Sequence, residues 1–316
     1  MAYQNPQLEN WTGRVSNKEL YLHEKVMLRP ISALQKTKKN TVAVLGYVCD
    51  EGVKRNQGRV GAKEGPNAIR KVLGKMPNHL PSSTHILDVG DILCLHNDME
   101  SAQELLSEKV LELLQKNTFP IVLGGGHDIA YGHFKGIKKY LVSKNETHTI
   151  GIINFDAHFD LRSNEIGNNS GTPFYQIAKE NTTFKYLCLG IRKDANDVQL
   201  FKTAKAFNVD YMLRDQFSLF NLSAIIKQLH IFIKAVDKIY VTIDMDGFSS
   251  AYAPGVSAAS PMGFDPEIVI ACLQKILASK KVISMDIAEM NPNYDRDNQT
   301  AKLAASLIHR VIHTIF

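Results

Sequence analysis

Short apolar runs and longer amphipathic stretches alternate along most of this chain, and this alternation restricts the possible fold more than any other feature. The apolar runs are TVAVLG, THILDVG, FPIVLG, TIGIINF, KYLCLG, VDYML, KIYVTID and KVISMDIA, which start at residues 41, 84, 119, 149, 185, 209, 238 and 281. Between them, stretches such as SAQELLSEKVLELLQK place apolar residues at helical spacing. Buried strands separated by amphipathic helices are typical of a parallel sheet covered by helices. We therefore expect an α/β fold.

The chain shows no sign of division into separate units. Its 316 residues, 44% of them hydrophobic, are enough for one large α/β domain or two small ones. No internal repeat and no low-complexity linker interrupts it. We therefore expect residues 1–316 to form a single domain. Residues 1–40 lack a clear period, and we expect this N-terminal extension either to lie over the sheet or to form an oligomer contact.

Charge and composition argue against several classes of partner. The formal charge of +5 is mildly basic, but apart from the run at residues 36–39 the cations are scattered, so we expect no nucleic-acid partner. No apolar run reaches the roughly 18 residues of a membrane helix, and the N-terminus is polar. The four cysteines show no CxxC spacing, which favours reduced thiols. We therefore expect a cytoplasmic protein without a membrane partner.

Polar side chains follow the run TIGIINF, in the stretch NFDAHFDLR. In strand geometry Asp156, His158 and Asp160 share one face, with about 7 Å between successive Cα atoms. Ligands of open α/β sheets bind at this end of the strands. The residues before Asp156 are of buried types, and an uncompensated buried carboxylate costs several kcal/mol unless it takes up a proton. A metal ion would compensate the carboxylates; the alternative is a solvated strand end or a helix cap.

Three further runs end in polar groups. KIYVTIDMDG repeats the two-residue spacing with Asp244 and Asp246, and KVISMDIAEMNP ends in Asp286 and Glu289. FPIVLGGGHD places His127 after a glycine triplet, although this motif alone is also typical of a plain turn before a helix. Without the KVISMDIAEMNP strand end, His127, the NFDAHFD stretch and the Asp244/Asp246 pair together offer four carboxylates and two imidazoles at the predicted site. This set is too large for one ordinary catalytic ion and suits two.

The motifs GGGHD, NFDAHFD, IDMDGFSSAYAPG and SMDIAEMNP, in this order, resemble those of the ureohydrolase family of arginase, agmatinase and formimidoylglutamase. The resemblance extends from about Gly58 to the C-terminus and includes GRVGAKEGPNAIR near its start. It implies a three-layer α/β/α fold with a mostly parallel, eight-stranded sheet and a pair of Mn²⁺ ions at the strand ends. Members of this family commonly form trimers or hexamers, so the resemblance also implies a homo-oligomer.

The resemblance implies a role for each polar side chain at the strand ends. It assigns six metal ligands, with His127 and Asp160 on one ion, His158 and Asp246 on the other, and Asp156 and Asp244 as bridges. Carboxylates and imidazoles suit Mn²⁺ better than the sulfur-rich sets of structural zinc do. Two ions roughly 3.5 to 4 Å apart share a water and present it as hydroxide at neutral pH. In the implied mechanism hydroxide attacks the substrate carbon, Glu289 pairs with the cationic nitrogen group, and Asp160 relays the proton.

Departures from the commoner family members indicate the substrate. Ser170, in NNSGTPF, stands where arginase-like chains have a histidine, and SGTPF together with DAHFDLR is similar to formimidoylglutamase. This likeness implies hydrolysis of N-formimidoyl-L-glutamate to L-glutamate and formamide, a step of histidine degradation. Arg162 lies two residues after a metal ligand, so alternation directs it to the same rim, where it can hold a carboxylate in bidentate fashion. Arg59 and Arg192 are candidates for the second carboxylate, and Ser170 and Glu289 also face the substrate.

Two alternatives to this function remain open. A guanidinobutyrase- or agmatinase-like enzyme would release urea from a guanidino compound, and one arginine would serve a single carboxylate equally well. A non-catalytic scaffold relative would keep the fold without turnover. The intact set of six ligand positions argues against the scaffold, which gains nothing from four convergent acids.

Overall fold

A computed structural model describes residues 2–37, 40–145 and 148–316 of the chain, so Lys38 and Lys39 of the basic run lie outside the described residues. Each of the eight apolar runs forms a strand of one sheet. These strands are β3 (Thr41–Val48), β4 (His85–Leu93), β5 (Phe119–Leu123), β6 (Ile150–Phe155), β7 (Lys185–Ile191), β8 (Asp210–Leu213), β9 (Lys238–Asp244) and β10 (Val282–Ala288). They lie in the order β4-β3-β5-β10-β9-β6-β7-β8, and every neighbouring pair is parallel. The predicted α/β class is confirmed.

Within the described residues, the sheet has ten strands rather than the eight that the sequence predicts. The additional strands are β1 (Ala2–Gln4) and β2 (Val26–Leu28), and both pair with the outer edge of β4. β1 runs antiparallel to β4 and places Tyr3 opposite Ile92, whereas β2 runs parallel and places Met27 opposite Leu87. The sequence did not reveal them, because a strand of three residues is too short to show an alternating period.

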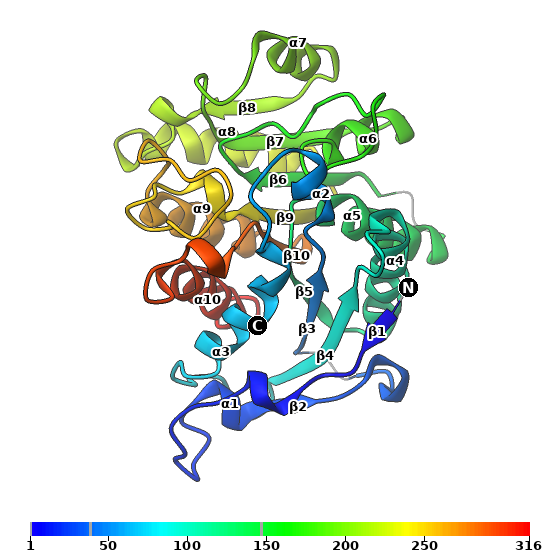
Figure 1. Cartoon of the computed structure of the whole chain (residues 1–316), viewed down its shortest axis with the longest axis vertical. Helices are drawn as coiled ribbons and strands as arrows, with labels where there is room; N and C mark the ends of the chain where they lie inside the picture. The colour runs from blue at the N-terminus through cyan, green and yellow to red at the C-terminus, as the bar shows by residue number, and fades with distance from the viewer. Residues whose placement is uncertain (1, 38–39, 146–147) are drawn as a thin grey trace.

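Helices cover both faces of the sheet, as Figure 1 shows. One face packs against α3 (Gly65–Leu73), α8 (Leu222–Lys234), α9 (Pro266–Ala278) and α10 (Gln299–Ile312), and the other against α4 (Met99–Gln115), α5 (Ile129–Ser143), α6 (Pro173–Glu180) and α7 (Val198–Ala206). Two shorter helices are α1 (Leu22–Lys25) and α2 (Glu51–Arg55). The described 3-10 turns are Leu8–Asn10, Ile31–Ala33, Ala62–Glu64, Arg214–Gln216, Leu219–Asn221, Met245–Gly247 and Pro292–Tyr294. The predicted three-layer arrangement is confirmed.

Two hydrophobic cores, one on each face of the sheet, explain why the central strands are continuous apolar runs. In β3, Val42 and Val44 pack into the core on the α3 side, whereas Ala43 and Leu45 pack into the core on the α4 side. Successive side chains of a strand point to opposite faces, so a strand covered on both faces needs apolar residues at every position. Within the described residues, no helix is long and apolar enough to cross a membrane.

A buried ionic cluster anchors the N-terminal extension. Trp11 is 4% exposed, and its indole Nε1 donates to Asp88 Oδ2 at 2.5 Å. The buried guanidinium of Arg70 binds Asp88 Oδ1 at 3.0 Å and Asp91 Oδ1 at 2.6 Å. The single guanidinium of Arg70 faces two carboxylates, and the indole N–H of Trp11 supplies one further hydrogen-bond donor to Asp88. The extension therefore completes the edge of the sheet instead of lying over it.

The four central strands position the candidate site. β5, β10, β9 and β6 are neighbours in the sheet, and their carboxyl ends meet at the same edge. The GGGHD, AEMNP, DMDG and DAHFD motifs follow or end these strands. Motifs that are far apart in the sequence are thereby brought together at one edge of the sheet.

Candidate metal centre and substrate pocket

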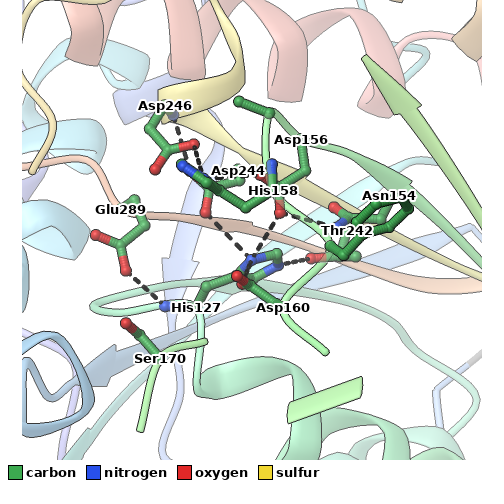
Figure 2. Close-up of polar contacts among 12 residues, drawn as sticks. His127, Asn154, Asp156, His158, Asp160, Ser170, Thr242, Asp244, Asp246 and Glu289 are labelled. Atoms are coloured by element: carbon green, nitrogen blue, oxygen red, sulfur yellow. Dashed lines mark hydrogen bonds and ion pairs between the residues drawn. The ribbon is translucent and has the colours of Figure 1, made fainter. Parts of the chain in front are cut away.

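The six predicted metal ligands lie together at this edge of the sheet (Figure 2). They form two groups, and within each group the potential ligand atoms lie within 4.8 Å of one another. The first group comprises His127, Asp156, Asp160 and Asp244, and the second comprises Asp156, His158 and Asp246. Asp156 belongs to both groups, which is the placement that a bridging carboxylate requires. Asp244, the other predicted bridge, belongs to the first group only.

The imidazole of His127 lies among three carboxylates, as Figure 2 shows. Its Nδ1 atom is 2.8 Å from Asp160 Oδ2, 3.1 Å from Asp244 Oδ2 and 3.2 Å from Asp156 Oδ2. The ring also packs edge-on against Phe174, with 5.4 Å between the ring centroids. Because Nδ1 faces the acids, it is the nitrogen that a metal ion in the first group would meet.

His158 makes the corresponding contacts in the second group. Its Nδ1 atom is 3.3 Å from Asp246 Oδ1 and 3.5 Å from Asp156 Oδ1. The His158 side chain is 25% exposed, compared with 1% for His127. The second group therefore lies nearer to solvent than the first.

The two-residue spacing of the acid motifs has a local structural reason. Asp156 Oδ1 accepts a hydrogen bond from the backbone N–H of His158 at 2.7 Å, and Asp244 Oδ1 accepts one from the backbone N–H of Asp246 at 2.8 Å. Each aspartate thereby closes the turn that follows its own strand, as aspartates in Asx turns do. The second oxygen of each aspartate faces His127. One side chain thus shapes the loop and contributes to the cluster.

The glycine triplet lets His127 approach the sheet. A Cβ atom on Gly125 would lie 1.7 Å from the carbonyl oxygen of Cys49, so only glycine fits at this position. The backbone N–H of His127 donates to Glu289 Oε1 at 2.9 Å. The GGGHD turn is therefore fixed between the end of β3 and the loop that follows β10.

The charges of the cluster compensate one another. Burial lowers the pKa of His127, but hydrogen bonds to three neighbouring carboxylates outweigh burial and raise this pKa well above its ordinary value. Burial is likewise outweighed at His158, whose pKa is raised by Asp246 and Asp156. Burial, together with the charges of Asp246 and Asp156, raises the pKa of Asp244. Protons on the imidazoles can therefore balance the acids, which is the task that divalent cations would perform.

The donor set fits two divalent cations. Asp246 Oδ1 is buried and accepts no hydrogen bond of normal geometry from any described residue, and its contact is the 3.3 Å ion pair with His158 Nδ1, although buried carboxylate oxygens are ordinarily hydrogen-bonded. Carboxylates and imidazoles are ligands that Mn²⁺ accepts, and neither group contains a thiolate. The cluster therefore has the oxygen-rich composition, and the unsatisfied ligand atom, that a site for such ions requires.

Two residues that contact the ligands were missed in the sequence. Asn154 donates to Asp156 Oδ2 at 2.9 Å, and Thr242 Oγ1 lies 2.9 Å from His127 Nε2. Each lies on a strand two positions before an aspartate of the cluster, and therefore on the same side of the chain. A polar residue inside an apolar run is the signal that could have indicated both.

A cavity of about 200 Å³ opens beside the six predicted metal ligands. Besides cluster residues, its polar lining consists of Asn56, Arg162, Ser170, Asn196, Ser257 and Glu289. Glu289 is 5% exposed, whereas Arg162 is exposed, so an acid lies deep in the cavity and a cation lies at its rim. This layout distinguishes the two ends of a bound molecule by charge.

Arg162 is the predicted carboxylate ligand that lines the cavity. Its guanidinium makes no hydrogen bond or ion pair with any residue that the structure describes. The backbone N–H of Arg162 donates to the carbonyl oxygen of Gly171 at 2.9 Å, next to Ser170. Ser170 Oγ in turn accepts a hydrogen bond from Asn56 Nδ2 at 3.2 Å. An unpaired guanidinium beside neutral polar groups can bind an anionic ligand.

Arg59 and Arg192, the other two predicted carboxylate ligands, do not line this cavity. Arg59 Nη2 donates to the carbonyl oxygen of Val256 at 2.7 Å, and its guanidinium stacks on Tyr294 at 3.8 Å from the ring centroid. Arg192 Nη2 pairs with Asp194 Oδ2 at 2.5 Å. Both guanidinium groups already have partners, so the structure does not bring them to the substrate pocket.

Asp160 and Glu289, the predicted catalytic residues, both adopt left-handed backbone conformations, with φ of +49° and +65°. Aspartate tolerates this region, but for a glutamate the conformation costs about 1 to 2 kcal/mol. The Asp160 carbonyl oxygen accepts from the backbone N–H of Phe174 at 3.3 Å. The Glu289 N–H donates to the carbonyl oxygen of Gly125 at 2.8 Å. Such strained residues are typical of functional sites.

Comparisons with known proteins agree with this geometry. The sequence profile of the Arginase family matches residues 40–313. Formimidoylglutamase of Geobacillus sp. (strain WCH70) is 42% identical over 308 aligned residues, covering 96% of this chain and 94% of the relative. The crystal structure of formimidoylglutamase from Bacillus subtilis subsp. subtilis str. 168 matches with a TM-score of 0.80 at 23% identity, covering 96% of this chain and 94% of that chain. The crystal structure of Trypanosoma cruzi formiminoglutamase with Mn²⁺₂ matches with a TM-score of 0.76 at 23% identity, covering 90% of this chain and 97% of that chain.

Proposed function

The chain belongs to the arginase family, and on this premise we propose that it hydrolyses N-formimidoyl-L-glutamate with water to L-glutamate and formamide. The name of the 42%-identical Geobacillus relative, which matches nearly the whole chain, supports this substrate. The reaction breaks the C–N bond of a linear amidine. It would serve histidine degradation.

The observation that carries this proposal is the distribution of charge in the cavity. Glu289 lies deep beside the predicted metal ligands, and the guanidinium of Arg162, which pairs with no described residue, lies at the rim. Formimidoylglutamate has a cationic amidine at one end, a carboxylate on the carbon next to the amidine nitrogen, and a second carboxylate at the far end. The cavity therefore matches its polarity in one orientation, with the amidine carbon directed at the metal cluster.

We assign two Mn²⁺ ions to the cluster as cofactors. His127 and Asp160 would hold one ion and His158 and Asp246 the other; Asp156, which belongs to both groups, and Asp244, which belongs to the first, are the predicted bridges. When bound, such a pair of ions lowers the pKa of a shared water and so supplies a nucleophile at neutral pH. The oxygen-rich donor set and the unsatisfied Asp246 Oδ1 support this assignment.

Glu289 is proposed to hold the amidinium group. Burial, with the charge of Asp246, raises the pKa of Glu289 to about 8. An adjacent amidinium favours the ionised carboxylate and would lower this pKa again. The N–H of His127 already occupies Glu289 Oε1, which leaves Oε2 free to accept a hydrogen bond from the substrate. Glu289 thereby orients the formimidoyl carbon.

Asp160 is proposed to move the proton. Its side chain is 12% exposed and lines the cavity. Asp160 would accept a proton from the attacking water and deliver it to the glutamate nitrogen as the C–N bond breaks. Ser170 occupies the wall where arginase-like relatives have a histidine, and its hydroxyl can orient a substrate but is a weak acid at neutral pH.

One observation favours a second candidate, an amidinohydrolase for a guanidino acid with a single carboxylate. Of the three predicted arginines, Arg162 alone has an unpaired guanidinium, and one guanidinium satisfies one carboxylate. The molecule 4-guanidinobutyrate is such a substrate and would yield urea. With formimidoylglutamate, the second carboxylate would instead meet the linked side chains of Asn56 and Ser170.

The deciding experiment measures glutamate release from N-formimidoyl-L-glutamate by Mn²⁺-loaded protein. Arginine, agmatine and 4-guanidinobutyrate are assayed in parallel for urea release. We expect turnover of the first compound alone. Turnover of 4-guanidinobutyrate instead would keep the metal site and replace the substrate. A protein that binds no divalent ion and turns over none of the four would overturn the enzymatic proposal.

We also propose a homo-oligomer, as the resemblance to arginase-like enzymes implies. Phe220 is fully exposed and Leu219 is 46% exposed, and both lie in the 3-10 turn Leu219–Asn221 directly before α8. Adjacent exposed apolar side chains of this size are candidates for burial in an interface. Light scattering would measure the molar mass, and we expect a multiple of the 35.3 kDa of one chain. A monomer at micromolar concentration would contradict this prediction.

A further inference from the structure

A buried polar cluster lies among the central strands next to His127, and we call it the Asp286 cluster. Asp286, on β10, is fully buried and accepts three hydrogen bonds. Its Oδ2 accepts from His133 Nδ1 at 2.6 Å and from the Tyr240 hydroxyl, and its Oδ1 accepts from Thr242 Oγ1 at 2.5 Å. The rings of His133 and Tyr240 also pack together, with centroids 4.7 Å apart. The mechanism proposed above uses none of these groups.

Ser284 extends the Asp286 cluster on the far side of His133. Ser284 Oγ donates to the carbonyl oxygen of Pro120 at 2.8 Å, so it accepts from His133 Nε2, which lies 2.6 Å away. The His133 ring therefore lies between Asp286 and Ser284, with Nδ1 facing Asp286 Oδ2 and Nε2 facing Ser284 Oγ.

Thr242 connects Asp286 to His127. A threonine hydroxyl has one hydrogen, and Thr242 donates it to Asp286 Oδ1. Thr242 Oγ1 can therefore only accept from His127 Nε2, which lies 2.9 Å away. A hydrogen on Nε2 leaves Nδ1, which faces the carboxylates of the first metal group, as the metal-binding nitrogen of the ring.

From this geometry we propose that Asp286 is a positioning residue, which acts through Thr242 to fix the tautomer and orientation of the His127 imidazole. This inference rests on the proposed metal site and extends it by two side chains into the sheet. In the opposite tautomer, the lone pair of His127 Nε2 would face a lone pair of Thr242 Oγ1. Metal-binding imidazoles that donate their second nitrogen to an oriented acceptor bind metal more tightly.

The test is a calorimetric titration of metal-free protein with MnCl₂, comparing Thr242→Val with Thr242→Ser. Valine keeps the shape of threonine without the hydroxyl, whereas serine keeps the hydroxyl. We expect Thr242→Val to bind one of the two ions roughly 10- to 100-fold more weakly, as removal of such a supporting contact does. Thr242→Ser should stay close to the wild type. The ion held by the second group should be unaffected, because the Asp286 cluster does not contact His158 among the described residues.

A second pair of variants separates positioning from stability. Asp286→Asn removes the charge that directs the Thr242 hydrogen, and we expect it to weaken the same ion. Tyr240→Phe removes another hydrogen bond to Asp286 but leaves the contact from Asp286 through Thr242 to His127. Both variants lose a buried interaction, so both lower the melting temperature. Tyr240→Phe should nevertheless keep the Mn²⁺ affinity of the wild type.

Wild-type Mn²⁺ affinity in both Thr242→Val and Asp286→Asn would overturn the inference, whatever their stability. If Thr242→Val does not fold, Asp286→Asn alone decides. Equal weakening of both ions would indicate a general loosening of the site and would also overturn it. A wild-type protein that binds two Mn²⁺ ions but leaves formimidoylglutamate intact would overturn the proposed function and not the positioning role.

Discussion

The orientation of single residues in this site is fixed by hydrogen bonds to backbone groups. Glu289 accepts the N–H of His127, and its own N–H is held by Gly125, so its left-handed conformation is fixed from two sides. Asp156 and Asp244 use one oxygen to close a turn and direct the other at His127. The orientation of these side chains is therefore set before any substrate binds, and such preorganisation is what electrostatic stabilisation of a transition state requires.

Asp160→Asn separates proton transfer from metal binding. The substitution removes the charge and keeps the shape of the side chain. We expect kcat to fall by at least about 100-fold, as loss of a proton-transfer group does. The Mn²⁺ affinity should fall less, because the other three members of the first group remain. Steady-state kinetics and titration with MnCl₂ measure the two effects, and equal losses in both would contradict the proton-transfer role.

Arg162→Met tests the carboxylate-binding role of the rim. Loss of hydrogen bonds to a charged group costs about 1.5 to 3 kcal/mol, so we expect KM to rise roughly 10- to 100-fold. The kcat should change less, since Arg162 lies away from the bond that breaks. Arg192→Met is the matched control, because Arg192 pairs with Asp194 outside the cavity. An equal rise of KM in both variants would show that Arg192 also contacts the substrate.

The motifs were sufficient to predict the family, which the profile match confirms, and the residues that meet at the strand ends. Short side chains at adjacent strand ends have few alternative orientations, so the alternation of side chains along each strand is enough to bring them together. Long side chains are different, because partners in other loops decide their direction. Arg59 lies on Tyr294, far along the chain, and nothing in the sequence around Arg59 indicates this contact.

Among the elements, the central strands were the easiest to predict and the edge strands the hardest. A central strand is covered on both faces and is therefore a continuous apolar run, as in β3. β1 and β2 are short and pair with β4 on one side only. Their position depends on contacts such as that of Trp11 with Asp88, which links residues 77 positions apart. Local sequence contains no trace of such a contact.

Trp11→Ala tests how much the N-terminal extension contributes to stability. Truncation of a buried aromatic side chain costs about 3 to 5 kcal/mol, and here it also removes a donor from Asp88. We expect the free energy of unfolding, measured with urea, to fall by this amount while kcat stays close to the wild type. Leu8→Ala, at a position that is 71% exposed, is the control and should change stability by less than about 0.5 kcal/mol. Equal stability of the two variants would contradict the anchoring role.

In the whole molecule, the candidate metal centre is acidic although the chain as a whole is basic. The chain has a formal charge of +5, whereas the centre gathers four aspartates around two histidines. The ligands come from the ends of β5, β6 and β9, so an ion that binds them links strands across the middle of the sheet. Metal binding is therefore coupled to the stability of the entire fold.

Removal of Mn²⁺ should lower the melting temperature, and the difference should grow with pH. The raised pKa values of His127 and His158 give the metal-free protein stability that is present below the unfolded value of about 6.5 and is lost as pH rises through the folded values. Mn²⁺ binds neutral imidazoles, so its stabilising effect increases over the same range. Calorimetry with EDTA or with MnCl₂, at several pH values on both sides of about 6.5, measures the difference. A difference independent of pH would contradict the role of these histidines.

The central place of β10 has a consequence for the newly made protein. β10 is the last strand in the sequence, yet it lies between β5 and β9. Among the described residues, the strand that precedes His127 has no direct sheet pairing with the strands that end in Asp156 and Asp244, and β10 is the strand that pairs with both sides. Chains that end before β10 therefore lack the strand that pairs the two sides of the site. Manganese in the cell would be captured by nearly finished chains and not by fragments.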